Sequence, residues 1–349
     1  MENSSKKISL YLDWLKEQKP YVNYSELWKK YRNDFIDKKF DSTKEYKFFG
    51  RGYLMNIGNF GKEKAINKYL TFYSLTLKVL NLGSYKFKRI SEKILKLLFF
   101  KNWNFDSNHN YGFEYGNLKE KYFKKNSKDL LLYEKIFKKI NWIYSYTSFK
   151  SFCYFAKFKD YIDIKEINNK TILEIGSGLC NFFTILDTQL ESYTYICLDI
   201  PEMIPAAYKC VCETKNSKDI DIFLPNQVSQ AVNSNADKKL IFITPDQLKD
   251  CGYSFDLLIN HESFAEMNIN IVNSYLKTFK KLANKDAILF LVNRLARQTN
   301  REDHKFETYT FFEDYDIKDV SIIYKEIDEF RALIHGWENQ ENIFYIGRI

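Results

Sequence analysis

The pattern of apolar and polar residues changes near residue 165 and divides the 349-residue chain into two parts. In the first part, apolar residues recur at three- and four-residue spacing over 69–80 and 90–100, as they do along one face of a helix. An amphipathic segment is also predicted at 10–15, and one or two helices over 130–158. We therefore expect residues 1–164 to form a helical N-terminal domain that shapes a substrate site or acts as a lid.

The segment 130–158 carries a dense stripe of aromatic side chains. Core packing is the interpretation we favour, because aromatic side chains at helical spacing usually face a core. A lid over a cofactor or an acceptor is the alternative, and the two roles are compatible. The stripe consists of Tyr133, Phe137, Trp142, Tyr146, Phe149, Phe152 and Phe155.

After residue 165, short apolar runs alternate with helical patterns. This alternation predicts an α/β fold with a Rossmann-like, doubly wound sheet over residues 165–349. Two helices are expected at 201–212 and 270–282, and the polar stretch 213–238 reads as a helix end followed by a loop. The seven predicted strands are 171–175, 193–198, 239–243, 255–259, 287–292, 320–326 and 343–347.

The first of these strands leads directly into a glycine turn. Ile172, Leu173 and Ile175 form the apolar run, and Gly176-Ser-Gly178 follows at once. A helix can then begin near Asn181. A strand, a glycine turn and a helix N-terminus are the parts of a nucleotide-binding crevice.

Acidic Glu174, two residues before the first glycine, narrows the choice of ligand. The pattern Glu-x-Gly-x-Gly resembles the first motif of S-adenosylmethionine-dependent methyltransferases of class I. That ligand carries a sulfonium and an amino group, which favour a nearby carboxylate, whereas the pyrophosphate of NAD favours a bare helix N-terminus. A nicotinamide site also needs a third glycine, at the position of Asn181. The resemblance implies S-adenosylmethionine as the cofactor and a seven-stranded methyltransferase sheet.

Two further positions fit this ligand. Asp199 ends the second strand, 23 residues after Gly176, where a carboxylate accepts hydrogen bonds from ribose hydroxyls; a helix N-cap before Pro201 is the alternative. Thr244 follows the third strand, where the adenine is expected. The complete predicted cofactor set is Glu174, Gly176, Ser177, Gly178, Asp199, Ile200, Thr244 and Asn260.

The fourth strand leads into Asn260-His-Glu-Ser-Phe-Ala-Glu-Met267, which carries the candidate catalytic residues. Ligands bind beyond the carboxyl ends of strands in open parallel sheets. We therefore expect His261, Glu262 and Glu266 to meet an acceptor near the methyl group. His261 is the candidate base, with Glu262 or Glu266 as its orienter or as a ligand for sugar hydroxyls; a structural histidine is the alternative.

This segment carries a narrower resemblance. The sugar O-methyltransferases of bacterial surface-polysaccharide gene clusters have a similar segment to Asn260-x-x-Ser263-Phe264-x-Glu266-Met267. Four further segments resemble that family: the turn 198–201, the segment 243–245, the helix that follows residue 267, and Leu291-Val-Asn-Arg294. The similarity covers about residues 165 to 300. It implies a sugar hydroxyl as the acceptor, which is free, nucleotide-linked or polymeric.

Basic side chains follow the fifth strand. Arg294 is the candidate for contact with an acidic sugar or with the diphosphate of a nucleotide-linked sugar. Arg297, Arg301 and His304 fit a solvated turn better, and the remaining histidines, His109 and His335, are expected to be structural.

The charge distribution argues against a nucleic-acid partner. The formal net charge is +8, but lysines are scattered among acidic residues without long blocks of one sign. The chain also lacks the Asp/Asn-Pro-Pro-aromatic tetrad used on exocyclic amines and a Pro-Cys nucleophile for pyrimidines. A methyltransferase of nucleic acid or of another small molecule, and a catalytically silent partner protein, remain the alternatives.

Cysteine usage and the N-terminus indicate a reduced, cytoplasmic setting. Six cysteines include no Cys-x-x-Cys pair, no apolar run follows the first lysines, and no stretch is long enough to span a membrane. No metal-ligating constellation stands out, because His261, Glu262 and Glu266 are too few hard ligands. The sequence is also compatible with a homo-oligomer.

Overall fold

A computed structural model describes residues 6–14 except 9 and 12, 119–140, 146–298 except 202, 213 and 215–217, 309–328 and 342–349. These residues fall in two compact units, which we describe separately. The larger contains residues 6–14, 138–140 and the described chain from 151 onward; the smaller contains 119–137 and 146–150. The helices predicted at 69–80 and 90–100 lie outside the described residues, and the domain boundary at 164 stays a prediction.

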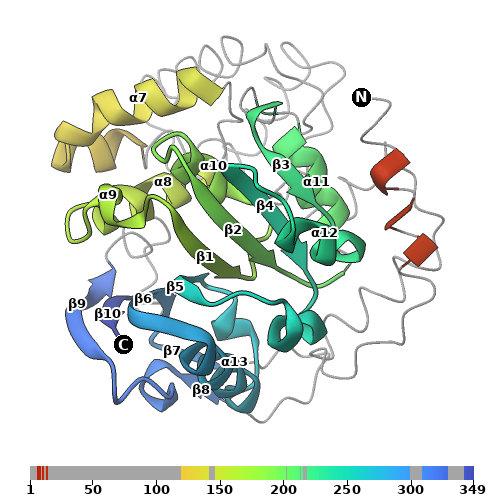
Figure 1. The fold of residues 1–349 in the computed structure, drawn as a ribbon. Helices are drawn as coiled ribbons and strands as arrows, with labels where there is room; N and C mark the ends of the chain where they lie inside the picture. The colour runs from red at the N-terminus through yellow and green to blue at the C-terminus, as the bar shows by residue number, and fades with distance from the viewer. Residues whose placement is uncertain are drawn as a thin grey trace, which may run out of the picture. The chain divides into compact units, whose positions relative to one another are not determined.

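An eight-stranded mixed sheet forms the centre of the larger unit (Figure 1). The first six strands in spatial order are parallel, whereas β10 runs antiparallel to both β6 and β9. A separate antiparallel pair joins β7 (Ala296–Gln298) and β8 (Tyr309–Phe311). The spatial order is β3 (Asp221–Phe223), β4 (Lys238–Ile243), β2 (Tyr193–Leu198), β1 (Lys170–Ile175), β5 (Phe255–His261), β6 (Ala283–Arg294), β10 (Asn342–Arg348) and β9 (Ser321–Asp328).

All seven predicted strands are confirmed, and the sheet has one strand more. The additional strand, β3, lies in the stretch 213–238, for which only a helix end and a loop were expected. It pairs with β4 at the sheet edge, where Ile222 lies opposite Leu240. Three residues in a polar context carry too short a pattern to be recognised, and their pairing with β4 decides their conformation.

Helices cover both faces of the sheet, as a doubly wound fold requires. The predicted helix at 270–282 is confirmed as α13 (Ile269–Leu282), whose N-cap Asn268 accepts a hydrogen bond from the backbone N–H of Asn270. In the described part of the chain, no helix is both long enough and apolar enough to cross a bilayer. The other helical elements, of which the first precedes β1 and the rest lie between strands, are α9 (Ile164–Ile167), α10 (Asn181–Asp187), α11 (Ile204–Cys212), η3 (Pro225–Gln227), α12 (Val228–Val232), η4 (Pro245–Asp250), η5 (Phe264–Glu266) and η6 (Phe312–Asp314).

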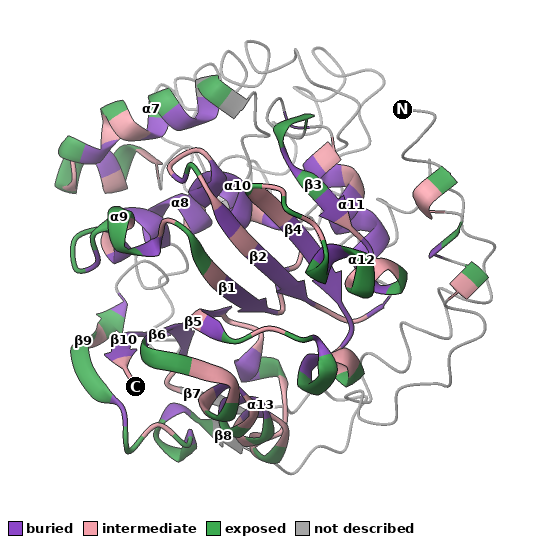
Figure 2. Cartoon of the chain, viewed as in Figure 1, coloured by how far each residue is buried: buried purple, intermediate pink, exposed green. Residues whose placement is uncertain are grey.

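The core lies on both sides of the central strands β1, β2, β4 and β5, which Figure 2 shows mostly as buried, whereas the edge strand β9 is largely exposed. On one face, Val272, Leu276 and Phe279 of α13 pack against apolar residues of the central strands. On the other face, Phe290 of β6 stacks on Phe158 of α8 (Tyr146–Phe158), with ring centroids 4.7 Å apart. Burial of side chains this large is worth about 1.5–3 kcal/mol each.

The members of the aromatic stripe whose side chains the structure describes are core residues. They lie on α7 (Lys128–Ile140) and α8, and the core interpretation is confirmed for them, whereas Trp142 and the side chain of Tyr146 lie outside the described residues. Within the smaller unit, the ring of Phe149 makes edge contacts with Tyr122, Phe123 and Tyr133. The buried members of the stripe, each at most 1% exposed, are Tyr133, Phe137, Phe149, Phe152 and Phe155.

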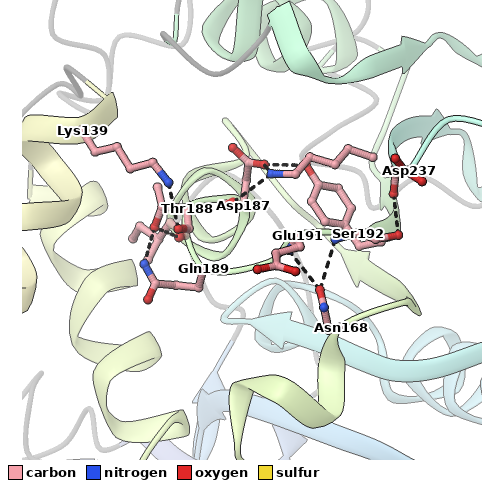
Figure 3. A network of polar contacts seen from close by, with 11 residues as sticks. Lys139, Asn168, Asp187, Thr188, Gln189, Glu191, Ser192 and Asp237 are labelled. Atoms are coloured by element: carbon pink, nitrogen blue, oxygen red, sulfur yellow. Dashed lines mark hydrogen bonds and ion pairs between the residues drawn. The ribbon is translucent and has the colours of Figure 1, made fainter.

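Polar contacts hold the amino ends of the central strands together (Figure 3). Asp187, at the end of α10, is buried and accepts hydrogen bonds from the Tyr193 hydroxyl at 2.8 Å and from Lys238 Nζ at 3.0 Å. Asn168 Oδ1 accepts from the backbone N–H groups of Glu191 and Ser192. These bonds tie β1, β2, β4 and α10 together at the end of the sheet opposite the glycine turn.

Replacing Asp187 by Ala should destabilise the protein by about 2–3 kcal/mol, because the Tyr193 hydroxyl and the Lys238 ammonium would lose a buried partner. Urea unfolding at neutral pH measures this loss. Asp237→Ala is the matched control, since its exposed side chain is removed while its backbone carbonyl still accepts from Ser192 and Tyr193. Equal stabilities of the two variants would contradict the role assigned to Asp187.

Candidate functional site

The glycine turn lies at the carboxyl end of β1, between the strand and α10. Gly176 and Gly178 have φ values of +70° and +54°, a region that side chains disfavour. The Gly176 N–H donates to the carbonyl of Leu198 at 2.8 Å, so the turn remains attached to the end of β2. The predicted helix begins at Asn181, and Cys180 at its N-cap also has positive φ.

Each glycine has its own reason to lack a side chain. A Cβ on Gly176 would come within 2.4 Å of Ser263 Cβ, so the turn after β5 packs directly against the turn after β1. Among the residues that the structure describes, none has a heavy atom within 4 Å of a Cβ placed on Gly178. As far as these residues go, the space beside Gly178 is open, and a ligand can approach its backbone.

Asp199 faces the same turn from the end of β2. Its Oδ2 accepts the Gly178 N–H at 2.7 Å, and its Oδ1 accepts the Ile200 N–H at 2.8 Å. The carboxylate is thus oriented by backbone donors at both oxygens. A carboxylate at the end of the second strand, beside the glycine turn, is a group that can accept hydrogen bonds from ribose hydroxyls.

Glu174 is the most deeply buried carboxyl group of this region, with 3% of its surface exposed. Its Oε2 accepts a hydrogen bond of 2.7 Å from the hydroxyl of Tyr195. Burial raises the pKa of Glu174 to about 8; the Tyr195 hydrogen bond acts against this shift, and the charge of Asp199 adds to it. A carboxyl group held this way is poised to receive a cationic ligand group, which would lower its pKa again.

Asn260 holds the turn after β5 and does not face a ligand through its amide. Its Nδ2 donates to the carbonyl of Ile175 at 2.7 Å and to Ser263 Oγ at 2.6 Å. Its Oδ1 accepts from the Phe264 N–H and from Asn293 Nδ2. All four hydrogen-bonding positions of this fully buried amide are used within the protein. The Asn260 amide thus has a structural role, and the cofactor contact expected of this residue stays a prediction.

His261 is the last residue of β5, and its ring lies among three aromatic rings. The centroids of Tyr154, Phe182 and Phe290 are 5.2, 4.7 and 4.8 Å from that of the imidazole. The residue is only partly buried. These contacts fix the ring orientation, which a base near a reacting group requires.

Glu262 follows with a left-handed backbone, φ +66°, and its N–H donates to the carbonyl of Val292 at 2.7 Å. Its Oε1 accepts from the hydroxyl of Tyr154 and from Nδ2 of Asn342. Neither Tyr154 nor Asn342 was recognised as a site residue in the sequence. Tyr154 belongs to a helix read as core, and Asn342 immediately precedes the last predicted strand without any motif.

The remaining predicted site residues have diverse environments. Thr244 is buried at the N-cap position of η4, where its backbone N–H and its hydroxyl both donate to Gln247 Oε1. Ser177 accepts a weak hydrogen bond from the Cys180 thiol within the turn. Glu266 is exposed on η5.

Arg294 ends β6 opposite Asn342 of β10, so the two side chains emerge on the same sheet face. The side chain of Arg297 and all of Arg301 and His304 lie outside the described residues, as do His109 and His335.

Neither a metal cluster nor a disulfide is found in the part of the chain that the structure describes. No three of its His, Cys, Asp and Glu side chains are grouped as metal ligands. The six cysteines are free thiols. Cys180 and Cys197 lie side by side beneath the glycine turn, with sulfur atoms 3.4 Å apart, and burial raises the pKa of Cys197.

Comparison with known proteins adds structural likenesses only. No protein-family profile and no curated protein sequence matches the chain. Magnesium protoporphyrin IX methyltransferase from Synechocystis PCC 6803, solved with bound S-adenosylhomocysteine, is similar at 12% identity and TM-score 0.36, over 65% of this chain and 96% of that one. A methyltransferase from Methanosarcina mazei (14%, TM-score 0.36, 55% and 96%) and TehB from Haemophilus influenzae (13%, TM-score 0.33, 54% and 61%) are also similar.

At these identities and TM-scores, the fold assignment depends on the strand order itself. The order β4-β2-β1-β5-β6-β10-β9, with β10 antiparallel, is that of methyltransferase sheets. The larger unit has the class I methyltransferase fold. The strand β3 is an addition at its edge. The narrower resemblance to sugar O-methyltransferases receives no support from these comparisons and stays a prediction.

Glu174→Gln should change how stability depends on pH. In the native protein this carboxyl keeps its proton up to about pH 8, whereas the unfolded chain releases it near the ordinary value of 4.5. The folded state therefore binds more protons between these values, and its contribution to stability is lost as pH rises through them. We expect urea unfolding of the wild type to show this decline and of Glu174→Gln to show a flatter profile.

Tyr195→Phe provides the matched variant, because it removes the hydrogen bond that holds the Glu174 pKa down. The decline should then extend to higher pH. Superimposable pH profiles for wild type and Glu174→Gln would show that Glu174 does not titrate in this range.

Proposed function

We propose that this chain is an S-adenosylmethionine-dependent O-methyltransferase that methylates a sugar hydroxyl in surface polysaccharide or glycoside biosynthesis. The observation that carries the cofactor assignment is the convergence of Glu174, Gly178 and Asp199 at the carboxyl ends of β1 and β2. The open space beside Gly178 and its hydrogen bond with Asp199 fit a ligand that passes close to the backbone. A buried carboxyl with a raised pKa fits the amino group of the same ligand.

Different residues bind different parts of the cofactor. Glu174 receives the amino group, and its pKa falls when the cation is beside it. Asp199, at the end of β2 beside the glycine turn, accepts from the ribose hydroxyls. Gly176, Ser177, Ile200, Thr244 and Asn260 lie at the same strand ends and complete the proposed cofactor set.

When bound, S-adenosylmethionine supplies an electrophilic methyl group on a sulfonium leaving group. The protein then has to align the acceptor oxygen with that methyl group and receive the hydroxyl proton. Alignment can contribute about 7–11 kcal/mol, and a base typically adds roughly 10²–10⁴-fold. His261 is the proposed base, since aromatic contacts orient its ring at the end of β5. Glu262 and Glu266 follow it in the chain as ligands for acceptor hydroxyls.

The sugar acceptor is supported by the segment from Asn260 to Met267 and by its resemblance to sugar O-methyltransferases. Arg294 emerges beside this segment and is the proposed contact for an acidic or nucleotide-linked sugar.

Isothermal titration should detect S-adenosylmethionine and S-adenosylhomocysteine binding in the micromolar range, roughly −8 kcal/mol. Asp199→Ala should weaken binding at least tenfold, because both ribose acceptors are lost. Asp246→Ala is the control, as this exposed carboxylate lies in the neighbouring turn after β4. Binding of NAD without any response to S-adenosylmethionine would contradict the cofactor assignment.

His261→Ala should lower methyl transfer to a panel of sugar acceptors by roughly 10²–10⁴-fold while cofactor affinity remains nearly unchanged. Transfer of radiolabelled methyl groups measures the first quantity and titration the second. If turnover survives within a few-fold, the base is elsewhere, and Glu266 is the next residue to replace.

A further inference from the structure

Two cysteine side chains meet beneath the glycine turn. Cys180 is the N-cap residue of α10, and Cys197 is the penultimate residue of β2, opposite Glu174 of β1. Their sulfur atoms are 3.4 Å apart, which is van der Waals contact and leaves no room for an atom between them. Seventeen positions separate the two residues in sequence, so the fold has brought the two thiols together.

The pair is enclosed by the protein. Neither side chain has any exposed surface, and the Cys180 thiol donates weakly to Ser177 Oγ at 3.9 Å. Burial raises the pKa of Cys197, so its thiol keeps its proton at neutral pH. Because the thiolate is the reactive form of cysteine, Cys197 is a poor first nucleophile.

The two cysteines lie on the segments that carry the proposed cofactor contacts. Cys180 is two residues after Gly178, and Cys197 is two residues before Asp199. The hydrogen bond from the Gly178 N–H to Asp199 Oδ2, 2.7 Å long, links the same two segments. Cys180 has a left-handed backbone, φ +58°, and its N–H donates to the Ser177 carbonyl at 2.9 Å. A backbone of this kind persists only where its surroundings hold it, so the turn has little freedom to absorb a change at the sulfur atoms.

We propose that Cys180 and Cys197 are a peroxide-sensitive pair whose oxidation to a disulfide weakens cofactor binding at the glycine turn. The gap of 3.4 Å between the sulfur atoms must then shorten to the disulfide length of about 2.05 Å. This approach draws the N-cap of α10 and the end of β2 together and alters the spacing of Gly178 and Asp199. Disulfide formation is independent of the proposed function, whereas its effect on the cofactor rests on that function.

The reaction has two steps and consumes one molecule of hydrogen peroxide. The Cys180 thiolate attacks a peroxide oxygen, the O–O bond breaks, and Cys180 becomes a sulfenic acid. The departing hydroxide takes up the proton that the Cys180 thiol released. The Cys197 sulfur then attacks the Cys180 sulfur, the S–S bond forms, and the S–O bond breaks. The sulfenic hydroxyl leaves with the Cys197 proton as water, so two thiols are oxidised and peroxide is reduced to two molecules of water.

Position and burial assign the two steps to the two cysteines. Cys180 adjoins the glycine turn, where no described heavy atom lies within 4 Å of a Cβ placed on Gly178. Hydrogen peroxide, which is little larger than water, therefore meets Cys180 first. Cys197 makes the second attack, because the contact between the sulfur atoms gives this intramolecular step a high effective concentration and offsets the scarcity of its thiolate.

Peptide mapping of the full chain tests the disulfide. The reduced protein is exposed to hydrogen peroxide and is then alkylated with iodoacetamide as it is unfolded. We expect mass spectrometry to find Cys180 joined to Cys197, and to find no such peptide in Cys180→Ser or Cys197→Ser. Dithiothreitol should restore both thiols. Cys251→Ser is the matched control, because it removes another buried thiol and should leave the disulfide in place.

Calorimetry of the reduced and the oxidised protein tests the effect on the cofactor. We expect oxidation to weaken S-adenosylhomocysteine binding about tenfold, which is within the usual range of coupling between sites, and dithiothreitol to restore it. Peroxide should change the affinity of Cys180→Ser by less than about twofold, since the first attack is lost. The coupling is reciprocal, so saturating S-adenosylhomocysteine should raise the reduction potential of the disulfide by about 30 mV, the equivalent of a tenfold change for two electrons.

The outcomes separate the disulfide from the cofactor assignment. If Cys180 and Cys197 both remain free at peroxide concentrations that oxidise glutathione completely, the proposal is wrong. The map of the unmodified chain gives this answer even where a serine variant fails to fold. If the disulfide forms but the affinity for S-adenosylhomocysteine changes by less than about twofold, the link to the cofactor is wrong. If the reduced protein does not bind S-adenosylhomocysteine, the proposed function is wrong, and the peptide map still decides on the disulfide.

Discussion

The close approach of the turns after β1 and β5 is the constraint on which the site depends. Asn260 donates to Ile175 and to Ser263, and Asn293 of β6 donates to Asn260. Through these hydrogen bonds, the buried side-chain amides of Asn260 and Asn293 join the carboxyl ends of the three adjacent strands β1, β5 and β6. Ser263 then occupies the space where a side chain at position 176 would lie, so only glycine fits there. A satisfied buried network of this kind specifies one arrangement, because any shift leaves polar groups unpaired.

Three carboxyl groups near these strand ends differ because their donors differ. Glu174 is buried with one hydroxyl donor, so its pKa is raised. Asp199 has a backbone N–H at each oxygen. Glu262 accepts hydrogen bonds at Oε1 from side chains of α8 and β10. The three carboxyl groups thus differ in burial and in the donors that orient them, which fits the different roles proposed for them.

The amino ends and the carboxyl ends of the strands differ in their local contacts. At the amino ends, Asp187 and Asn168 close the structure with hydrogen bonds between neighbouring elements. At the carboxyl ends, no described heavy atom lies near a Cβ built on Gly178, and Glu262 has a left-handed backbone, φ +66°. The two ends of the sheet therefore differ in how closely neighbouring elements are joined.

The sequence by itself determined the sheet and the glycine turn. Strand periodicity and the apolar run before Gly176 are local patterns, and a local pattern is readable without knowledge of distant neighbours. Only the tertiary structure decided that Asn260 is used up within the protein, that β3 pairs at the edge, and that Tyr154 and Asn342 meet Glu262. These outcomes depend on contacts between residues up to 188 positions apart, for which neither spacing nor composition leaves a signal.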